Sequence, residues 1–249
     1  MKYIFANWKM YLDFDETMIL TNQLLQSDFD VDDLTLALFP NTLAFTEVEK
    51  ACRNSFFSVG AQNVQWTPKG AYTGGTSAVM FKDAGARYAL VGHSERRHIF
   101  GETNDDVHKK MEACIDAGLT PILCIGETAD DRAEGKREYR LKKQLTKALE
   151  GLDVSRTEFL VAYEPVWAIS SSGEGEACEP DQAGEIHAWI KQELRVFKDT
   201  PIPILYGGSI HGGNVVSYVS HEAIDGVLIG YASVSVETFS ALVHAVLAQ

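Results

Sequence analysis

The sequence predicts an α/β protein, a (β/α)8 barrel of eight parallel strands with an outer ring of helices. Three observations support this prediction. Eight short apolar runs recur along the 249 residues, and most are followed by a stretch with helical periodicity. Such alternation indicates parallel strands joined by helical crossovers. Eight units in about 250 residues match the size of a (β/α)8 barrel.

The predicted strands are the apolar runs themselves, because strands buried on both faces are apolar throughout. In chain order they span residues 3–8, 34–40, 56–63, 86–93, 119–127, 158–165, 202–208 and 225–230. A doubly wound open sheet is the alternative with the same alternation. That fold usually has a glycine-rich turn after its first strand, whereas FANWKM at residues 5–10 contains no glycine.

Five amphipathic stretches between these runs predict the longer helices. Their apolar residues recur every three to four positions in residues 15–26, 104–118, 129–151, 180–197 and 236–248. Gly118 and Gly151 fall where C-terminal caps are expected, and Pro180 suits a first helical turn. No segment indicates a domain boundary, so one domain over residues 1–249 is expected.

The composition and the spacing of cysteines and histidines disfavour several kinds of partner and site. The 35 acidic and 22 basic residues give a net charge of −13, which disfavours nucleic-acid and membrane-surface partners. No apolar run is long enough to span a bilayer, and the N-terminus MKYIFANWKM has no signal-peptide pattern. The cysteines form no CxxC pair, which predicts reduced thiols in a cytoplasmic protein. The histidines are scattered without ligand spacing, so no metal site is expected.

Polar residues and glycines follow most predicted strands, at the end where such barrels have their active sites. In chain order these are Asn7, Lys9, Gln62, Asn63, His93, Ser94, Glu95, Glu127, Glu164, Gly207, Gly208, Ser209 and Gly230. Taken singly, each residue type also fits an ordinary role, such as a solvated lysine, a structural histidine or a tight glycine turn. As a set, they are expected at one mouth of the barrel.

The glycines after the last two strands predict a phosphate site. Phosphate sites in these barrels use the loops after strands seven and eight. Backbone N–H groups approach an anion closely where side chains are absent, as at Gly207, Gly208 and Gly230. Lys9 would add a positive charge. A small phosphorylated substrate is therefore expected.

Glu164 and His93 are the titratable pair of the predicted mouth. A carboxylate can remove a proton from a carbon next to a carbonyl, and a neutral imidazole can polarise that carbonyl. The residues SERR after His93 predict a short helix with Ser94 as its cap, whose dipole would keep the imidazole neutral. The segment 165–179 is long for a structureless loop and predicts a lid.

The motifs of this chain resemble the triosephosphate isomerase family. They are, in order, ANWKM, GAQN, YTGG, GHSERRHIFGE, CIGE, YEPVWAI, YGGSI and DGVLIGYAS, from residue 5 to past residue 230. The resemblance implies a TIM barrel that interconverts dihydroxyacetone phosphate and glyceraldehyde 3-phosphate without cofactor or metal. Such an enzyme serves glycolysis and gluconeogenesis.

The resemblance also implies roles for individual residues. Glu164 would be the base, His93 the electrophile, and Asn7 and Lys9 would bind substrate, with Glu95 supporting Lys9. The implied phosphate donors are the backbone N–H groups of Ser170, Ser209, Gly230 and Tyr231. The family is typically a homodimer, in which the loop carrying Thr73 would reach the Asn7 and His93 region of the neighbouring subunit.

The sequence departs from the family pattern at three positions, in the implied phosphate site and in the implied dimer contact. Ser170 stands at a usual glycine, in a lid that is longer than usual, and Tyr231 stands at another usual glycine. Gly75 stands where a glutamate usually pairs with the arginine of the partner subunit that corresponds to Arg96. Without that glutamate, Arg96 would need another partner.

Two other functions fit a barrel with a phosphate site. An aldolase or an indole-type synthase would also bind a phosphorylated substrate, but a Schiff-base aldolase needs a lysine in strand six, and EFLVAYE has none. A barrel that has lost catalysis could serve as a binding protein. The presence of Glu164, His93 and Lys9 together argues against that interpretation.

Overall fold

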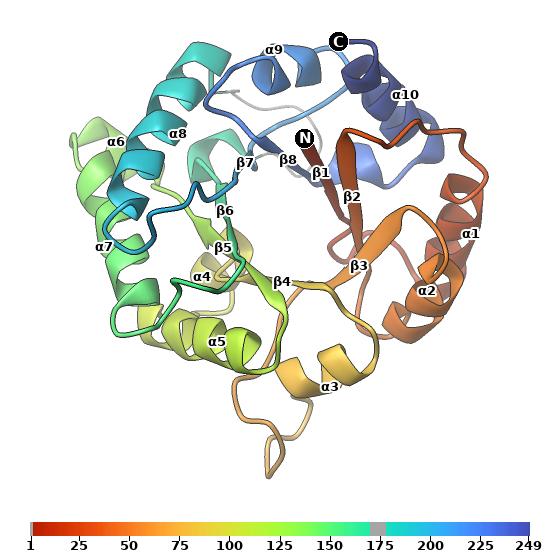
Figure 1. Ribbon diagram of the computed structural model, residues 1–249, viewed down its shortest axis with the longest axis horizontal. Helices are drawn as coiled ribbons and strands as arrows, with labels where there is room; N and C mark the ends of the chain where they lie inside the picture. Colours follow the sequence, from red (N-terminus) through yellow and green to blue (C-terminus); the bar gives the residue numbers. More distant parts are fainter. Residues whose placement is uncertain (1, 170–177) are drawn as a thin grey trace.

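The predicted closed barrel is present in the computed structural model, which describes residues 2–169 and 178–249. Eight parallel strands pair in chain order, and the last pairs with the first (Figure 1). The strands are β1 (Lys2–Asn7), β2 (Leu34–Phe39), β3 (Phe57–Ala61), β4 (Tyr88–Val91), β5 (Thr120–Ile125), β6 (Leu160–Tyr163), β7 (Ile204–Tyr206) and β8 (Gly226–Ile229). Seven lie within the predicted runs, and β1 begins one residue earlier.

Helices form the outer ring around these strands in Figure 1. They are α1 (Phe14–Leu24), α2 (Phe45–Cys52), α3 (Ala78–Asp83), α4 (Ser94–His98), α5 (Asn104–Asp116), α6 (Ala129–Ala133), α7 (Arg137–Leu149), α8 (Pro180–Leu194), α9 (Val215–Val219) and α10 (Val236–Leu247). Two 3-10 turns, η1 (Val166–Ala168) and η2 (Tyr231–Ser233), follow β6 and β8. The short helices α2, α3 and α9 were not predicted, because five to eight residues give little periodic signal.

The prediction of one helix over residues 129–151 was wrong. The chain breaks between α6 and α7 at Gly135, which has a φ of 67°, a left-handed conformation that favours glycine. Gly118 and Gly151 also have positive φ, at 71° and 78°, so the predicted ends of α5 and α7 are confirmed. Pro180 lies in the first turn of α8, as predicted.

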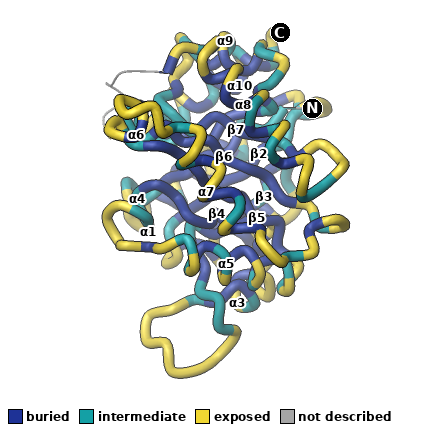
Figure 2. The backbone as a smooth tube through the Cα atoms, turned by 90° about the vertical axis from the view of Figure 1, so that its left-hand side faces the viewer, coloured by how far each residue is buried: buried dark blue, intermediate teal, exposed yellow. Residues whose placement is uncertain are grey.

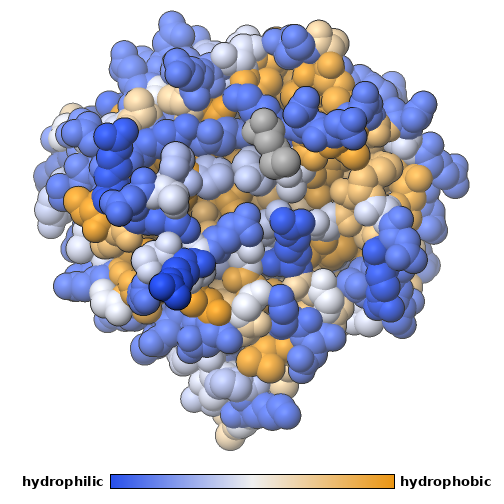
Figure 3. All heavy atoms as spheres, in the orientation of Figure 1, coloured by the Kyte–Doolittle hydropathy of each residue, from blue (hydrophilic) through white to orange (hydrophobic). Residues whose placement is uncertain are grey.

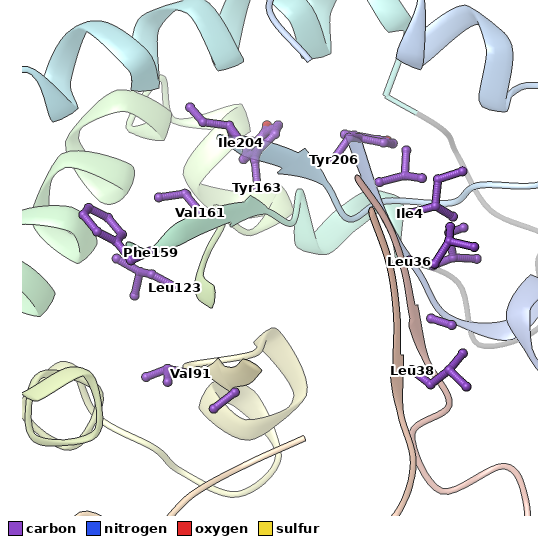
Figure 4. Packing of buried hydrophobic residues seen from close by; sticks show 14 of the residues in the cluster. Ile4, Leu36, Leu38, Val91, Leu123, Phe159, Val161, Tyr163, Ile204 and Tyr206 are labelled. Atoms are coloured by element: carbon purple, nitrogen blue, oxygen red, sulfur yellow. The ribbon is translucent and has the colours of Figure 1, made fainter. Parts of the chain in front are cut away.

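Two apolar layers hold the barrel together. Inside it, the rings of Phe5, Phe39 and Tyr88 pack with centroids 4.9 to 5.7 Å apart. Outside it, strand side chains pack against the helices, and Figure 4 shows Val161 and Tyr163 of β6 among them. Because both strand faces are buried, the strands appear in the sequence as continuous apolar runs.

One long loop departs from the compact outline. Residues 68–75, between β3 and α3, are mostly exposed and project away from the barrel at the lower edge of Figures 1, 2 and 3. Elsewhere the face seen in Figure 3 is mostly hydrophilic over the helices, with apolar patches between them. None of the helices in the described residues has the length and apolar character needed to cross a membrane.

Candidate active site

Glu164 lies directly after β6 and is 1% exposed. Its Oε2 accepts a hydrogen bond from the Ser94 N–H at 2.9 Å, and its Oε1 lies 3.2 Å from Nε2 of His93. His93 and Ser94 both follow β4, and Ser94 lies 70 residues before Glu164 in the chain. The barrel therefore brings the predicted carboxylate and imidazole into direct contact.

The imidazole of His93 is held as a neutral donor. His93 itself caps α4, so the prediction that Ser94 is the cap was wrong. Its Nδ1 accepts the backbone N–H of Glu95 at 3.3 Å. An N–H can only donate, so Nδ1 carries no proton and the ring proton is on Nε2, facing Glu164.

Two glycines make room for Glu164, one beside its backbone and one beside its side chain. A Cβ atom on Gly126 would lie 1.8 Å from the Glu164 carbonyl oxygen, and one on Gly207 would lie 2.9 Å from Glu164 Cγ. The side chain of Gln144 fixes the first of these glycines by bonding both its N–H and its carbonyl, at 2.9 and 3.0 Å. The position of Glu164 is thus set by close packing from the ends of β5 and β7.

Lys9, which follows β1, has an unusual backbone conformation. Its φ of 49° is the one positive value among the non-glycine residues that the structure describes, a conformation that costs about 1–3 kcal/mol. Asn7 Oδ1 accepts the Lys9 N–H at 3.2 Å, and Gln62 donates to the Lys9 carbonyl at 2.8 Å. The Lys9 ammonium pairs with Glu95 at 2.7 Å. These contacts hold Lys9 at the mouth.

The loops after β7 and β8 form the other side of the mouth. The N–H groups of Gly230 and Tyr231 donate to no backbone carbonyl among the described residues. The Ser209 N–H instead donates to the Ala168 carbonyl at 3.0 Å. Tyr231 has no positive φ, and its ring lies edge-on to Tyr11. Ser170 lies outside the described residues, as does most of the predicted lid, residues 170–177.

Glu127, after β5, anchors the segment that follows Glu164. Its Oε1 accepts hydrogen bonds from Trp167 at 2.9 Å and from Tyr163 at 3.1 Å. Burial raises the pKa of the Glu127 carboxyl, and these two hydrogen bonds oppose the rise. The Arg132 guanidinium stacks over Trp167, 3.9 Å from the ring centroid. The sequence predicted Glu127 at the mouth but did not predict these partners.

Arg97, which sequence reasoning did not single out, ties the strand ends together behind the site. Its guanidinium donates to the carbonyls of Gly92 and Cys124, and to Asn104 on α5. Burial lowers its pKa. The repeated arginines of SERR gave no signal of which one would bond to the strand ends.

Arg96 has a partner within its own chain. It donates to Glu102 at 2.8 Å, and Glu102 also pairs with the buried Lys110. Glu102 of the same subunit thus pairs with Arg96 in place of the glutamate that is missing at position 75. Gly75 and Thr73 both lie in the exposed loop 68–75, some twenty positions before Arg96 in the sequence.

One cavity joins the Glu164 and His93 side chains to the glycine loops. It has a volume of about 470 Å³ and is lined by Asn7, Lys9, His93, Glu164, Ser209, Gly230 and Tyr231, among others. His211, which sequence reasoning did not place at the mouth, lines it as well. The cavity offers a buried carboxylate, a neutral imidazole, an ammonium and the backbone N–H groups of the loop after β8. This arrangement suits proton transfer at a carbon of a small anionic substrate.

Comparisons with known proteins agree with this geometry. A model of the triosephosphate isomerase family matches residues 2–246. The triosephosphate isomerase of Trichodesmium erythraeum is 39% identical over 242 residues, 97% of each chain. That of Carboxydothermus hydrogenoformans is 38% identical over 247 residues, also 97% of each chain. That of Dictyoglomus thermophilum is 36% identical over 243 residues, 96% of each chain.

Proposed function

We propose that in this chain, which belongs to the triosephosphate isomerase family, Glu164 carries a proton between two carbons of a triose phosphate. The chain is an isomerase that interconverts dihydroxyacetone phosphate and D-glyceraldehyde 3-phosphate, a reaction of glycolysis and gluconeogenesis. The observation that carries the proposed role is the contact of the buried Glu164 carboxylate with the neutral His93 ring at 3.2 Å.

The proposed reaction passes through an enediolate. Glu164 takes a proton from the hydroxyl-bearing carbon of dihydroxyacetone phosphate, and the electron pair moves to the carbonyl oxygen. The Nε2–H of His93 hydrogen-bonds that oxygen as its negative charge grows, and the hydroxyl proton passes to it. Glu164 then returns its proton to the former carbonyl carbon, giving glyceraldehyde 3-phosphate. No net proton is gained or lost, and a positioned base of this kind contributes about 10²–10⁴-fold.

Lys9 and Asn7 are proposed to bind the substrate beside this pair. The Lys9 ammonium lies between Glu95 and the loop after β8, since a Cβ on Gly230 would lie 3.6 Å from its Nζ. A cation in that place stabilises both the phosphate and the developing enediolate charge. Glu95 is proposed to orient Lys9, and the N–H groups of Gly230 and Tyr231 to bind the phosphate. Ser209 would join them by exchanging its Ala168 partner for phosphate, and Ser170 is the fourth proposed donor.

Isomerisation in heavy water tests the proton-shuttle step. If a carboxylate carries the proton, some of the glyceraldehyde 3-phosphate formed will contain deuterium at the carbon next to the aldehyde, as read by proton NMR. The Glu95→Gln variant serves as a control that keeps the base, and it should show the same labelling pattern at reduced turnover. Product free of deuterium at every time point would contradict the expected exchange of the carboxyl proton with solvent and would count against Glu164 in this role.

We also propose that the protein is a homodimer. The exposed loop 68–75 carries Tyr72 and Thr73, and a second cavity of about 330 Å³ opens beside Lys9, His93 and Arg96. The rim of that cavity includes Met10 and Phe100, which are 92% and 68% exposed. Apolar side chains this exposed are typical of an interface. The loop of one subunit, led by Thr73, is proposed to fill the cavity of the other, with Gly75 and Arg96 at the contact.

Sedimentation tests this dimer. Thr73→Arg should shift the protein from about twice the monomer mass towards monomer, because an arginine cannot fit where a threonine is held. The control Ser155→Arg places the same charge in an exposed loop after α7. A wild-type protein that sediments as a monomer at micromolar concentration would contradict the proposal.

The proposed location is the cytoplasm. The four cysteines are all free and buried. Burial raises the pKa of Cys52 and Cys114 to about 12, so both remain thiols at neutral pH. Such unpaired thiols suit a reducing compartment. Cell fractionation with an antibody to the chain would test this, and recovery in an oxidising compartment would contradict it.

A further inference from the structure

His211 lies in the turn that follows β7 and lines the same cavity as Lys9, Ser209 and Gly230. These neighbours are the groups proposed above to bind the substrate phosphate. Glu164 and His93 are also titratable groups that line this cavity. His211 takes no part in the proposed proton transfer, so its presence at the phosphate end calls for a separate explanation.

The ring of His211 is oriented by its own turn. Its Nδ1 accepts the Gly213 N–H at 3.1 Å, and its backbone N–H donates to Asn214 Oδ1 at 2.9 Å. Since Nδ1 accepts, the ring is neutral and its proton is on Nε2. The structure records no acceptor for that Nε2–H among the residues it describes. A neutral imidazole with one uncommitted donor therefore stands at the cavity.

We propose that His211 is a further phosphate-binding residue, whose Nε2–H donates to an outer oxygen of the substrate phosphate. The inference rests on the triose phosphate activity proposed above. A phosphate dianion takes several donors, and the Ser209 N–H can serve as one only after it leaves the Ala168 carbonyl. A side-chain donor from the adjoining turn adds one hydrogen bond to those proposed for the Gly230 and Tyr231 N–H groups.

Two substitutions separate this role from a structural one. His211→Asn keeps an acceptor at the position of Nδ1 for the Gly213 N–H, but it has no donor as far out as Nε2. His211→Gln places an amide N–H near the Nε2 position and gives up the turn acceptor. Phosphate binding predicts that asparagine is the damaging change and that glutamine largely restores the wild type. A structural role in the turn predicts the reverse order.

The measurement is steady-state kinetics of both variants, with inorganic phosphate as inhibitor and phosphate-free glyceraldehyde as a second substrate. In His211→Asn, KM for glyceraldehyde 3-phosphate and the inhibition constant of phosphate should both rise by about three- to tenfold, the effect of one hydrogen bond. The value of kcat and the turnover of glyceraldehyde should stay unchanged. Restoration by His211→Gln would support the role.

Two results would overturn the inference. One is a phosphate inhibition constant in His211→Asn equal to that of the wild type. The other is an equal loss in both variants that extends to glyceraldehyde. If the wild type had no isomerase activity, calorimetric titration of phosphate into the same three proteins would still decide the role of His211. Failure of the proposed reaction and failure of this inference are thus distinguishable.

Discussion

Replacing Gly207 by alanine should displace the Glu164 carboxylate. The new Cβ would lie 2.9 Å from Glu164 Cγ, whereas ordinary contacts begin near 3.4 Å. Relief requires a movement of about 0.5 Å, and Glu164 cannot simply turn aside, because Ser94 and His93 hold its two oxygens. A misplacement of 1 Å at a reacting group can cost about 10²-fold. We therefore expect kcat to fall about tenfold in Gly207→Ala.

The same loop provides a matched control. A methyl group on Gly212 would have open space around it, with nothing within 4 Å, and neither glycine has a positive φ. Gly212→Ala should therefore keep wild-type kcat. The assay is steady-state turnover of glyceraldehyde 3-phosphate, with circular dichroism to confirm that both variants are folded. A folded Gly207→Ala variant with kcat within about twofold of wild type would refute the packing argument.

Two further predictions concern stability. His187 is fully buried, and burial lowers its pKa to about 3, so the unfolded state binds more protons than the folded state as pH falls from the ordinary value of 6.5. At pH 5 this difference lowers the free energy of unfolding by about 2 kcal/mol. In urea unfolding, His187→Leu should therefore lose less free energy of unfolding between pH 7.5 and 5 than the wild type does. A loss equal to that of the wild type would contradict this prediction. Gln144→Leu leaves the buried N–H and carbonyl of Gly126 unpaired. It should lower the free energy of unfolding by about 2–4 kcal/mol, and a change below about 0.5 kcal/mol would count against this bonding.

The barrel could be predicted from the sequence because its strands are buried on both faces. Each strand appears as a short apolar run, and the loops around it carry the polar residues. The helix boundaries were harder to predict from the sequence than the strands. The break at Gly135 lies inside a stretch whose apolar spacing continues on both sides, so periodicity alone could not locate it.

The candidate site could be predicted as a set of residues but not as a set of contacts. The strand ends indicated the residues of one mouth, because parallel strands all end there. The bond from the Ser94 N–H to Glu164 joins residues 70 apart, and local sequence does not encode such a pairing. The cap of α4 was misassigned for a related reason. Serine is the commoner cap, but the His93 ring accepts the Glu95 N–H.

The role of Glu164 is tested by the turnover of Glu164→Gln beside the wild type, in a coupled assay of glyceraldehyde 3-phosphate with a metal chelator present. Glutamine keeps the shape of the side chain and removes the base. If Glu164 is the base, the wild type should convert substrate rapidly in chelator, and kcat of the variant should be lower by at least about 10²-fold with little change in KM. A variant that turns over like the wild type would show that Glu164 is not the base.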